Sequence, residues 1–154
     1  MKKKIAILGS TGSIGKTLLK IISKDKNKFE IVLLSANKNY KELIKQTKKF
    51  KIKNVIINDL TSFQKFKKQN KNLNLNIYKN FKNFKKIFNK KIDYTMSSIV
   101  GIEGLDPTYK IIKHTKSIAI ANKETIICGW SLINKELKKH KTKFFPVDSE
   151  HFSL

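Results

Sequence analysis

Arginine is absent from this 154-residue sequence, so lysine supplies all 34 of its basic residues. Only eleven residues are acidic, and the net charge is +23. Such a charge attracts phosphate and makes nucleic acid the first partner to consider. Evolved contacts to phosphates and bases favour the bidentate arginine fork, however, and seldom dispense with it. Lysine, asparagine and isoleucine are enriched together, as in products of AT-rich genes, so we attribute the charge to composition and expect no nucleic-acid partner.

Cysteine and long apolar runs are also scarce. Cys128 is the single cysteine, which excludes a disulfide framework and a cysteine metal site and favours a reducing compartment. The apolar run from Ile5 to Leu8 is shorter than the roughly 7–15 residues of a secretory signal, and no stretch approaches a membrane span. We therefore expect a cytoplasmic protein without a membrane partner.

Short β-prone runs alternate with lysine-rich amphipathic runs along the chain. The helical patterns include GKTLLKIISK, NYKELIKQTKKF and KETIICGWSLINKELKKH. The runs that predict strands are Lys4–Leu8, Ile31–Ser35, Asn54–Ile57, Leu73–Tyr78, Ile92–Met96, Ser117–Ala121 and Lys143–Val147. This order predicts a single α/β domain with a doubly wound, Rossmann-like and mostly parallel sheet of about seven strands.

The stretch YKNFKNFKKIFNKK interleaves aromatic residues with lysines, as a platform for single-stranded nucleic acid would. Its apolar residues Phe81, Phe84, Ile87 and Phe88 are spaced by three and four, however. That spacing favours the core-facing side of one helix.

A glycine-rich turn, GSTGSIG, lies between the first predicted strand and the first predicted helix. Gly9, Gly12 and Gly15 would allow a tight turn, close approach of the backbone to a pyrophosphate, and close packing of helix on strand. The N-terminus of the helix would add unpaired N–H groups and the positive end of its dipole. This context predicts a dinucleotide-binding turn, although G-x-x-G-x-x-G is less common than G-x-G-x-x-G.

The end of the second strand predicts which dinucleotide binds. An acid there would bind the ribose of NAD, but the sequence LLSANKNY contains none. Lys38 would instead attract a 2′-phosphate through a charge-assisted hydrogen bond. We therefore expect NADPH to be preferred over NADH. Because lysine is so common in this chain, the absence of an acid is stronger evidence for this preference than the presence of Lys38.

Two tyrosines raise an alternative. Tyr78–Lys82 and Tyr109–Lys113 match the Y-x-x-x-K dyad of short-chain dehydrogenases, and Ser97 precedes the second dyad. With four tyrosines among so many lysines, about one such match is expected by chance. The second dyad also lies in GLDPTYKIIK, a short helical pattern behind a proline, where that family has a long helix. A short-chain-type NADP-dependent dehydrogenase and a basic nucleic-acid-binding module remain alternative hypotheses.

Acidic residues that could hold a metal follow the seventh predicted strand, in PVDSEH. Asp148 and Glu150 are two residues apart, so their carboxylates share a face in extended backbone. They lie at the carboxyl end of the predicted sheet, where open α/β folds bind ligands. Two hard oxygen ligands suit Mg²⁺ or Mn²⁺. Lys123 follows the sixth predicted strand at the same edge, with a cationic head suited to a phosphorylated substrate.

Four stretches, GSTGSIG, SSIVGIEGLDPT, IAIANKETIICG and PVDSEH, together resemble the 1-deoxy-D-xylulose-5-phosphate reductoisomerase family in order and spacing. The resemblance extends from Lys4 to about His151. It implies an NADPH- and Mg²⁺- or Mn²⁺-dependent enzyme of isoprenoid precursor biosynthesis. Such an enzyme isomerises and reduces 1-deoxy-D-xylulose 5-phosphate to 2-C-methyl-D-erythritol 4-phosphate, and the full-length enzyme would be a homodimer.

The resemblance also implies roles for individual residues. Lys123, Asp148 and Glu150 would be catalytic, with Asp148 and Glu150 as metal ligands and Lys123, Ser149 and Glu150 as substrate contacts. The implied cofactor-binding residues are Thr11, Gly12, Ser13, Ile14, Asn37, Lys38, Asn39, Asn122 and Glu124. Asn37 stands where the family usually has glycine, and we expect a small penalty because asparagine tolerates left-handed backbone. Ser97 and Ser98 replace alanines, which should be harmless.

We expect residues 1–154 to be an NADPH-binding domain that ends at the metal and substrate motif. A third metal carboxylate, a catalytic flap and a C-terminal helical domain, which the family has, are absent from this sequence, so we expect the chain alone to have little or no activity. We derive no role for His151. His114 and His140 are expected at the surface, and Cys128 and Trp130 in packing.

Overall fold

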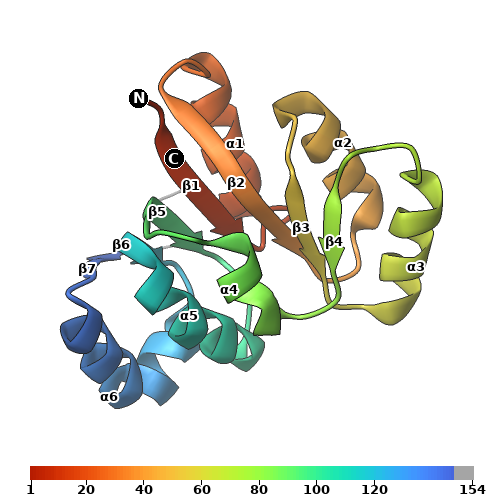
Figure 1. The fold of residues 1–154 in the computed structure, drawn as a ribbon. Helices are drawn as coiled ribbons and strands as arrows, with labels where there is room; N and C mark the ends of the chain where they lie inside the picture. The colour runs from red at the N-terminus through yellow and green to blue at the C-terminus, as the bar shows by residue number, and fades with distance from the viewer. Residues whose placement is uncertain (148–154) are drawn as a thin grey trace.

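The computed structural model describes residues 1–147, which form one seven-stranded parallel sheet in the order β4-β3-β2-β1-β5-β6-β7. Figure 1 shows the strands running side by side through the molecule. The strands are β1 (Lys3–Leu8), β2 (Phe29–Ala36), β3 (Asn54–Ile57), β4 (Asn76–Tyr78), β5 (Ile92–Ser97), β6 (Thr115–Ile120) and β7 (Lys143–Pro146). The predicted doubly wound parallel sheet is confirmed.

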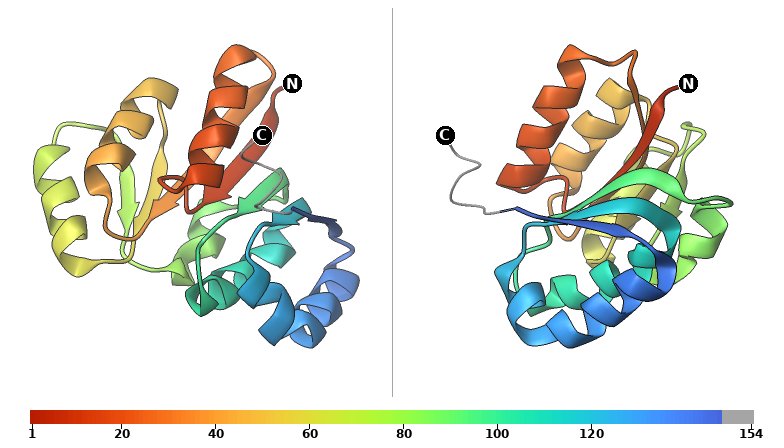
Figure 2. Two further views of the ribbon diagram at one scale, coloured as in Figure 1. Left: turned by 180° about the vertical axis from the view of Figure 1, so that it is seen from behind. Right: turned by 90° about the vertical axis from the view of Figure 1, so that its left-hand side faces the viewer.

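The helices cover the two faces of the sheet in two groups, which the views of Figure 2 separate. The first group packs on one face and is α1 (Ser13–Lys24), α2 (Tyr40–Phe50) and α3 (Leu60–Gln69). The second group packs on the other face and is α4 (Phe84–Ile87), α5 (Leu105–Ile111) and α6 (Lys123–His140). Short 3₁₀ helices precede or extend the second group: η1 (Phe81–Asn83), η2 (Ile102–Gly104) and η3 (Ile112–His114).

The central strand β1 explains the two-sided core. Ile5 and Ile7 point into the cluster beneath α1 and α2, whereas Ala6 and Leu8 point into the cluster beneath α5 and α6. All four are buried. A strand that is buried on both faces reads as a continuous apolar run, which is why its pattern in the sequence lacks polar alternation.

The fourth strand and the aromatic segment after it differ from the prediction. The strand begins at Asn76 and not at Leu73, because the residues before it form a turn in which Leu73 N donates to Asn70 O at 3.2 Å. The segment after it is not one helix but η1 followed by the single turn of α4. It ends there because Phe88 already has the extended backbone that leads toward β5. Burial of Phe81 and Phe84 confirms the predicted core face.

His114 is not the surface residue that we expected. Its ring lies 5.9 Å from that of Phe84 and 5.6 Å from that of Phe88. Its Nε2 is buried and has no hydrogen-bond partner within residues 1–147. Burial, with smaller contributions from Lys113, His140 and Lys85, lowers the pKa of His114 to about 4. The ring therefore stays neutral and belongs to the aromatic core.

The predictions for three side chains of α6 are confirmed only in part. His140 is partly buried, and its Nε2 lies 2.8 Å from Glu136 Oε1. Trp130 packs against Phe144, with ring centroids 5.3 Å apart, as expected. Cys128 is exposed, so its expected role in packing is wrong.

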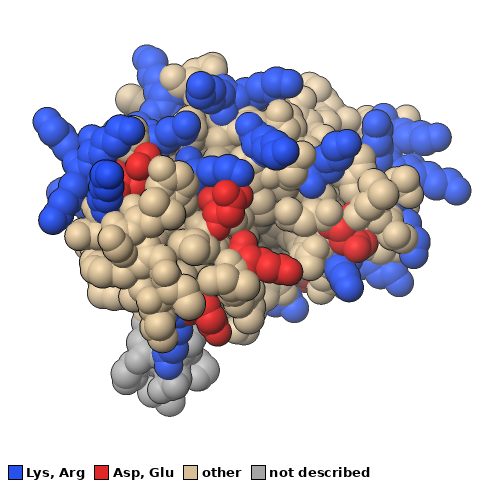
Figure 3. Space-filling view, turned by 90° about the horizontal axis from the view of Figure 1, so that it is seen from below, with Lys and Arg blue, Asp and Glu red and all other residues tan. Residues whose placement is uncertain are grey.

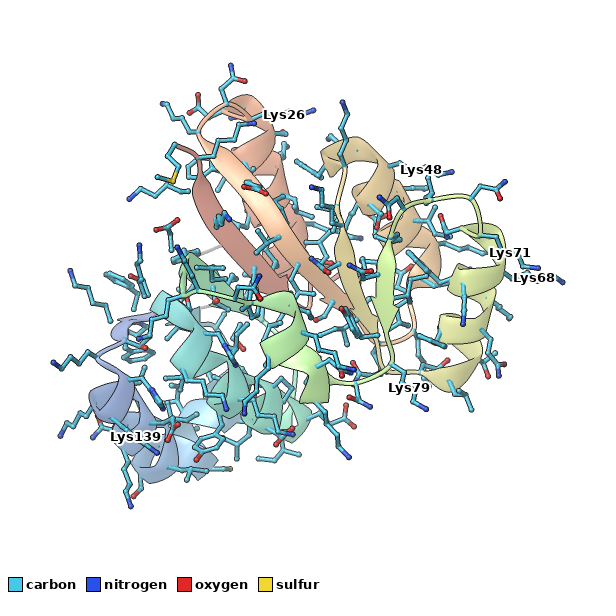
Figure 4. The ribbon with its side chains drawn as sticks, viewed as in Figure 1. Lys26, Lys48, Lys68, Lys71, Lys79 and Lys139 are labelled. Carbon is cyan, nitrogen blue, oxygen red and sulfur yellow. The ribbon has the colours of Figure 1, made fainter. Side chains whose placement is uncertain are left out.

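The lysines lie at the surface, where water solvates their charge. Lys26, Lys48, Lys68, Lys71, Lys79 and Lys139, which Figure 4 labels, project outward at the edge of the fold. None of the helices within the described part of the chain is both long and apolar enough to cross a bilayer.

Candidate functional site

The order in which successive strands are added to the sheet reverses at β1. The strands from β1 to β4 extend the sheet to one side, and β5 then returns to pair with the other edge of β1. Outside the carboxyl ends of β1, β2 and β5 lies a cavity of about 620 Å³. It is lined by Gly9, Thr11, Gly12, Ser35, Ala36, Asn37, Asn58, Phe81, Ser98, Ile99, Val100 and Glu103. Open α/β sheets bind their ligands at this switch point.

No lysine is among the described residues that line this cavity, although lysine is the main charged residue elsewhere. Figure 3 views the molecule from below and shows a hollow near the middle of that face, with acidic side chains beside it and most lysines toward the outline. The lysine enrichment therefore stops at the cavity. This pattern favours a functional constraint on the residues around the hollow.

The glycine turn forms the floor of the cavity and needs two of its glycines for steric reasons. Gly9 has a φ of +81°, and a Cβ there would lie 2.9 Å from the Ser98 backbone carbonyl. A Cβ on Gly15 would lie 2.5 Å from Gly9 O, so α1 could not pack so close to the turn. Around Gly12 only Gly9 O lies within 4 Å of such a Cβ, at 3.6 Å. Gly12 thus leaves its backbone open toward the cavity.

The N-terminus of α1 faces the same cavity without a side-chain cap. Gly12 is the N-cap residue, and within the described residues no side chain caps the helix there. The Thr17 hydroxyl donates to Ser13 O at 2.9 Å, which does not occupy the N–H groups of the first turn. Ser13 is exposed and Ile14 is half-buried. Uncapped N–H groups and the positive dipole end would favour an anion at this turn.

A buried polar network, which the sequence analysis missed, holds the turn in place. Gly9 N donates to Ser35 Oγ at 2.9 Å, and Ser10 N donates to Ser35 O at 2.9 Å. Ser10 Oγ donates to Gln46 Oε1 at 2.8 Å, and Gln46 Nε2 donates back to Ser10 O at 2.9 Å. The network ties the turn to both β2 and α2.

The end of β2 places Asn37, Lys38 and Asn39 in exposed positions beside the cavity. Asn39 Oδ1 caps α2 by accepting from Glu42 N at 3.2 Å. Asn37 does not have the left-handed backbone that we expected, since the non-glycine residues with positive φ in the described range are Lys51 and Lys141. The expected penalty for losing glycine at Asn37 is therefore absent.

An acid does reach the end of β2, from the next βα unit. Asp59 N donates to Asn37 O at 3.3 Å, and the Asp59 carboxylate caps α3. Hydrogen bonds from Ser62 N and Ser62 Oγ lower the pKa of Asp59, and the charges of Lys38 and Lys65 lower it further. The sequence around Lys38 contains no acid, but the fold brings Asp59 close to it.

Asn122 shapes one wall of the cavity through its amide group. Its Nδ2 donates to Ile99 O and to Gly101 O, at 2.5 and 2.6 Å, and its Oδ1 accepts from Thr125 N at 3.2 Å. Both amide hydrogens are thus used within the protein. Asn122 holds the loop after β5 against α6, and that loop supplies Ile99 and Val100 to the cavity.

The serines that replace alanines after β5 are accommodated by hydrogen bonds. Ser98 Oγ donates to Leu8 O at 2.8 Å, which joins the ends of β5 and β1. Ser97 Oγ lies 2.6 Å from Thr108 Oγ1, which itself donates to Gly104 O. Neither hydroxyl is left unpaired.

The structure brings only some of the predicted site residues to the cavity. Thr11, Gly12 and Asn37 line it, and Ser13 and Ile14 begin the helix that faces it. Lys123 and Glu124 are exposed in the first turn of α6, at the same edge of the sheet but outside the cavity lining. Asp148, Ser149, Glu150 and His151 lie outside the described residues. Within residues 1–147, no three His, Cys, Asp or Glu side chains gather as metal ligands.

Neither Y-x-x-x-K dyad lines the cavity. Tyr109 lies on α5 against the core, and Tyr78 lies in the edge strand β4. The negative charge of Glu136 is the main reason why the pKa of Tyr109 is raised, with burial and a hydrogen bond from Tyr109 to Glu136 adding to it. A catalytic tyrosine needs a lowered pKa to exchange protons near neutral pH. The short-chain dehydrogenase alternative has no support in this arrangement.

Comparison with known proteins gives one consistent result. Residues 5–129 match the family model described as 1-deoxy-D-xylulose 5-phosphate reductoisomerase. The 1-deoxy-D-xylulose 5-phosphate reductoisomerase of Pelagibacter ubique is 61% identical over 154 residues, which cover 99% of this chain and 40% of that protein. The chain thus spans about two fifths of the length of this relative.

Solved structures agree with the sequence match. The reductoisomerase from Zymomonas mobilis in complex with NADPH has a TM-score of 0.88 and 29% identity, over 98% of this chain and 40% of that one. A reductoisomerase in complex with NADPH, fosmidomycin and magnesium has a TM-score of 0.87 and 28% identity, over 97% of this chain and 37% of that one.

Proposed function

Because the chain belongs to the 1-deoxy-D-xylulose 5-phosphate reductoisomerase family, we propose that it forms the NADPH-binding part of such an enzyme. The whole enzyme would isomerise and reduce 1-deoxy-D-xylulose 5-phosphate to 2-C-methyl-D-erythritol 4-phosphate, in isoprenoid precursor biosynthesis. The match covers two fifths of the relatives' length, so the proposal assigns cofactor binding, and not turnover, to these 154 residues.

The observation that carries the proposal is the uncapped glycine turn at the switch point of the sheet. Gly9 and Gly15 have no room for a Cβ, Gly12 leaves its backbone open, and the first turn of α1 faces a cavity of about 620 Å³. That volume is in the range of cofactor pockets. A pyrophosphate fits this turn because unpaired N–H groups and a helix dipole favour an anion.

NADPH, when bound, supplies the hydride for the reduction. In the proposed arrangement the first turn of α1 holds the pyrophosphate, and Lys38 attracts the 2′-phosphate at the end of β2. The loop that Asn122 positions, with Ile99 and Val100, forms the opposite wall and excludes water from that side. Thr11, Asn39 and Glu124 complete the proposed cofactor contacts.

The metal and substrate part of the proposal comes from the sequence. Asp148 and Glu150 would bind Mg²⁺ or Mn²⁺, whose preferred ligands are carboxylate oxygens. Lys123, Ser149 and Glu150 would contact the substrate, and Lys123 begins α6 at the carboxyl edge of the sheet. We further propose a cytoplasmic enzyme that is a homodimer at full length and has neither a nucleic-acid nor a membrane partner.

Titration with NADPH, followed by the fluorescence of the cofactor, tests the proposal. NADPH should bind more tightly than NADH, and Lys38→Ala should reduce the difference. A DNA or RNA oligonucleotide should lose its affinity steeply as salt rises to the physiological range. Failure to bind either cofactor would refute the proposal, and oligonucleotide binding that survives physiological salt would favour the nucleic-acid alternative.

A second measurement addresses the reaction. NADPH oxidation with 1-deoxy-D-xylulose 5-phosphate and Mg²⁺ or Mn²⁺ should be negligible for these 154 residues beside a full-length homologue. Turnover near that of the homologue would show that cofactor binding is too narrow a role.

A further inference from the structure

Lys65 is a cation beside the end of β2 that lies far from Lys38 in the sequence. It projects from α3, and its Nζ lies 5.9 Å from the centroid of the Tyr40 ring. Tyr40 is the first residue of α2 and directly follows Lys38 and Asn39. A lysine ammonium over a tyrosine face gains a cation–π attraction, which favours this placement of the side chain.

Two hydrogen bonds fix α3 to the segment that carries Lys38. Ser62 Oγ donates to Lys38 O at 3.0 Å, and Asp59 N donates to Asn37 O at 3.3 Å. Ser62 is buried and Lys38 is exposed, so the contact between Ser62 Oγ and Lys38 O is partly shielded from water. Since Lys65 is three residues after Ser62, it projects from nearly the same side of α3.

Charged side chains near the end of β2, beside the cavity, decide whether this segment attracts a phosphate. The Asp59 carboxylate accepts from Ser62 N at 2.9 Å and lies 2.8 Å from Ser62 Oγ, whose single hydrogen is shared between Asp59 Oδ2 and Lys38 O, so the carboxylate stays in place and ionised. Asp59 and Lys38 by themselves would sum to zero charge. Lys65 makes this group of charges net positive. Without it, the Asp59 carboxylate would balance the charge of Lys38 and leave no net attraction for a phosphate dianion.

We propose that Lys65 is a specificity-determining residue that binds the 2′-phosphate of NADPH together with Lys38. The inference rests on the proposed function and adds a residue from the third βα unit to the cofactor site. Lys38 is supplied by the loop after β2, and Lys65 approaches from α3 across the Asp59 carboxylate. Two cations on separate elements bracket a dianion better than one, and they lose this advantage for NADH, which lacks the 2′-phosphate.

Substitution of Lys65, with a matched lysine on the same helix as control, tests the inference. Lys65→Gln should weaken NADPH binding about tenfold, within the range for a lost charge-assisted contact, and should leave NADH binding unchanged. Lys67→Gln removes the same charge from an exposed position about 200° around the helix, so it should leave both affinities unchanged. Lys65→Arg keeps the charge and should restore most of the NADPH affinity.

The outcomes separate this inference from the proposed function. Equal losses for Lys65→Gln and Lys67→Gln would show only a general effect of net charge and would overturn the role of Lys65. Equal affinities of the unsubstituted protein for NADPH and NADH would also overturn it, while cofactor binding itself would stand. If the unsubstituted protein binds neither cofactor, the proposed function fails and the role of Lys65 fails with it.

Discussion

Ser10 and Gln46 form a reciprocal pair of hydrogen bonds between the glycine turn and α2. The Ser10 hydroxyl donates to Gln46 Oε1 at 2.8 Å, and Gln46 Nε2 donates to Ser10 O at 2.9 Å. Both residues are buried, so neither the Ser10 nor the Gln46 polar groups can hydrogen-bond to water instead. The pair links the shape of the glycine turn to the packing of a helix that begins beside Lys38.

Gln46→Leu should therefore destabilise the protein by about 1–3 kcal/mol, because it leaves the Ser10 carbonyl and hydroxyl without these partners. It should also weaken NADPH binding by loosening the turn. Denaturant unfolding and cofactor titration measure the two effects. Gln64→Leu, at an exposed position of α3, is the control and should change stability by no more than about 0.5 kcal/mol. Equal stability of the two variants would contradict the role of the pair.

Gly15→Ala should destabilise the protein by about 1–3 kcal/mol and abolish NADPH binding. The new Cβ would meet Gly9 O at 2.5 Å, and a backbone atom cannot move aside without opening the turn. In most helices the same change is stabilising. Gly129→Ala in α6 is the control, since its Cβ meets Leu105 Cδ1, the end of a flexible side chain. Unchanged NADPH affinity in Gly15→Ala would disprove the close-packing argument.

Asn122→Asp should cost about 1–3 kcal/mol of stability and weaken NADPH binding. Aspartate can still cap α6 through its oxygen, but it replaces the two donors to Ile99 O and Gly101 O with an acceptor that repels them. The loss would therefore report on the cavity wall and not on the cap. Asn80→Asp, where the side chain only accepts from Lys82 N, should be nearly neutral in thermal unfolding.

Lys51→Gly and Lys141→Gly should each stabilise the protein by about 1 kcal/mol, because glycine adopts left-handed backbone without steric cost. Lys51 has a φ of 53° at the end of α2, and Lys141 has a φ of 52° at the end of α6. Their effects should add, since the two sites belong to different helices. Lys45→Gly, at an exposed position inside α2, should instead destabilise by about 1 kcal/mol. The shift of the denaturant midpoint measures whether each substitution stabilises or destabilises the protein.

Stability should fall as pH is lowered from about 6.5 toward 4, and His114 should account for part of the fall. Burial holds the pKa of His114 at about 4 in the folded chain, below its ordinary value of 6.5. In this interval the unfolded chain takes up a proton that the folded chain refuses, so acid favours unfolding. Thermal midpoints of His114→Phe should depend less on pH over the same interval. An unchanged pH profile would contradict the assignment.

The sequence by itself determined the fold class, the glycine turn and the long helices. The run KETIICGWSLINKELKKH became α6 with the same bounds. GSTGSIG follows β1 as predicted, but its last three residues already belong to the first turn of α1. These features follow from the spacing of apolar residues within one segment and from the backbone freedom of glycine. Both can be read from a short stretch of sequence without knowing which distant residues it contacts.

Only the tertiary structure decided which side chains surround the candidate site. Gln46 reaches Ser10, Asn122 reaches Ile99, and Asp59 arrives beside Asn37, although each pair is well separated in the sequence. The same packing partly buried His114 against Phe84 and Phe88, although the residue looked like a surface residue in a lysine-rich segment. Hydrogen bonds, burial and local charge depend on the relative positions of whole helices and strands. No pattern within one segment encodes those positions, so they become visible only when the sheet and its two layers of helices have formed.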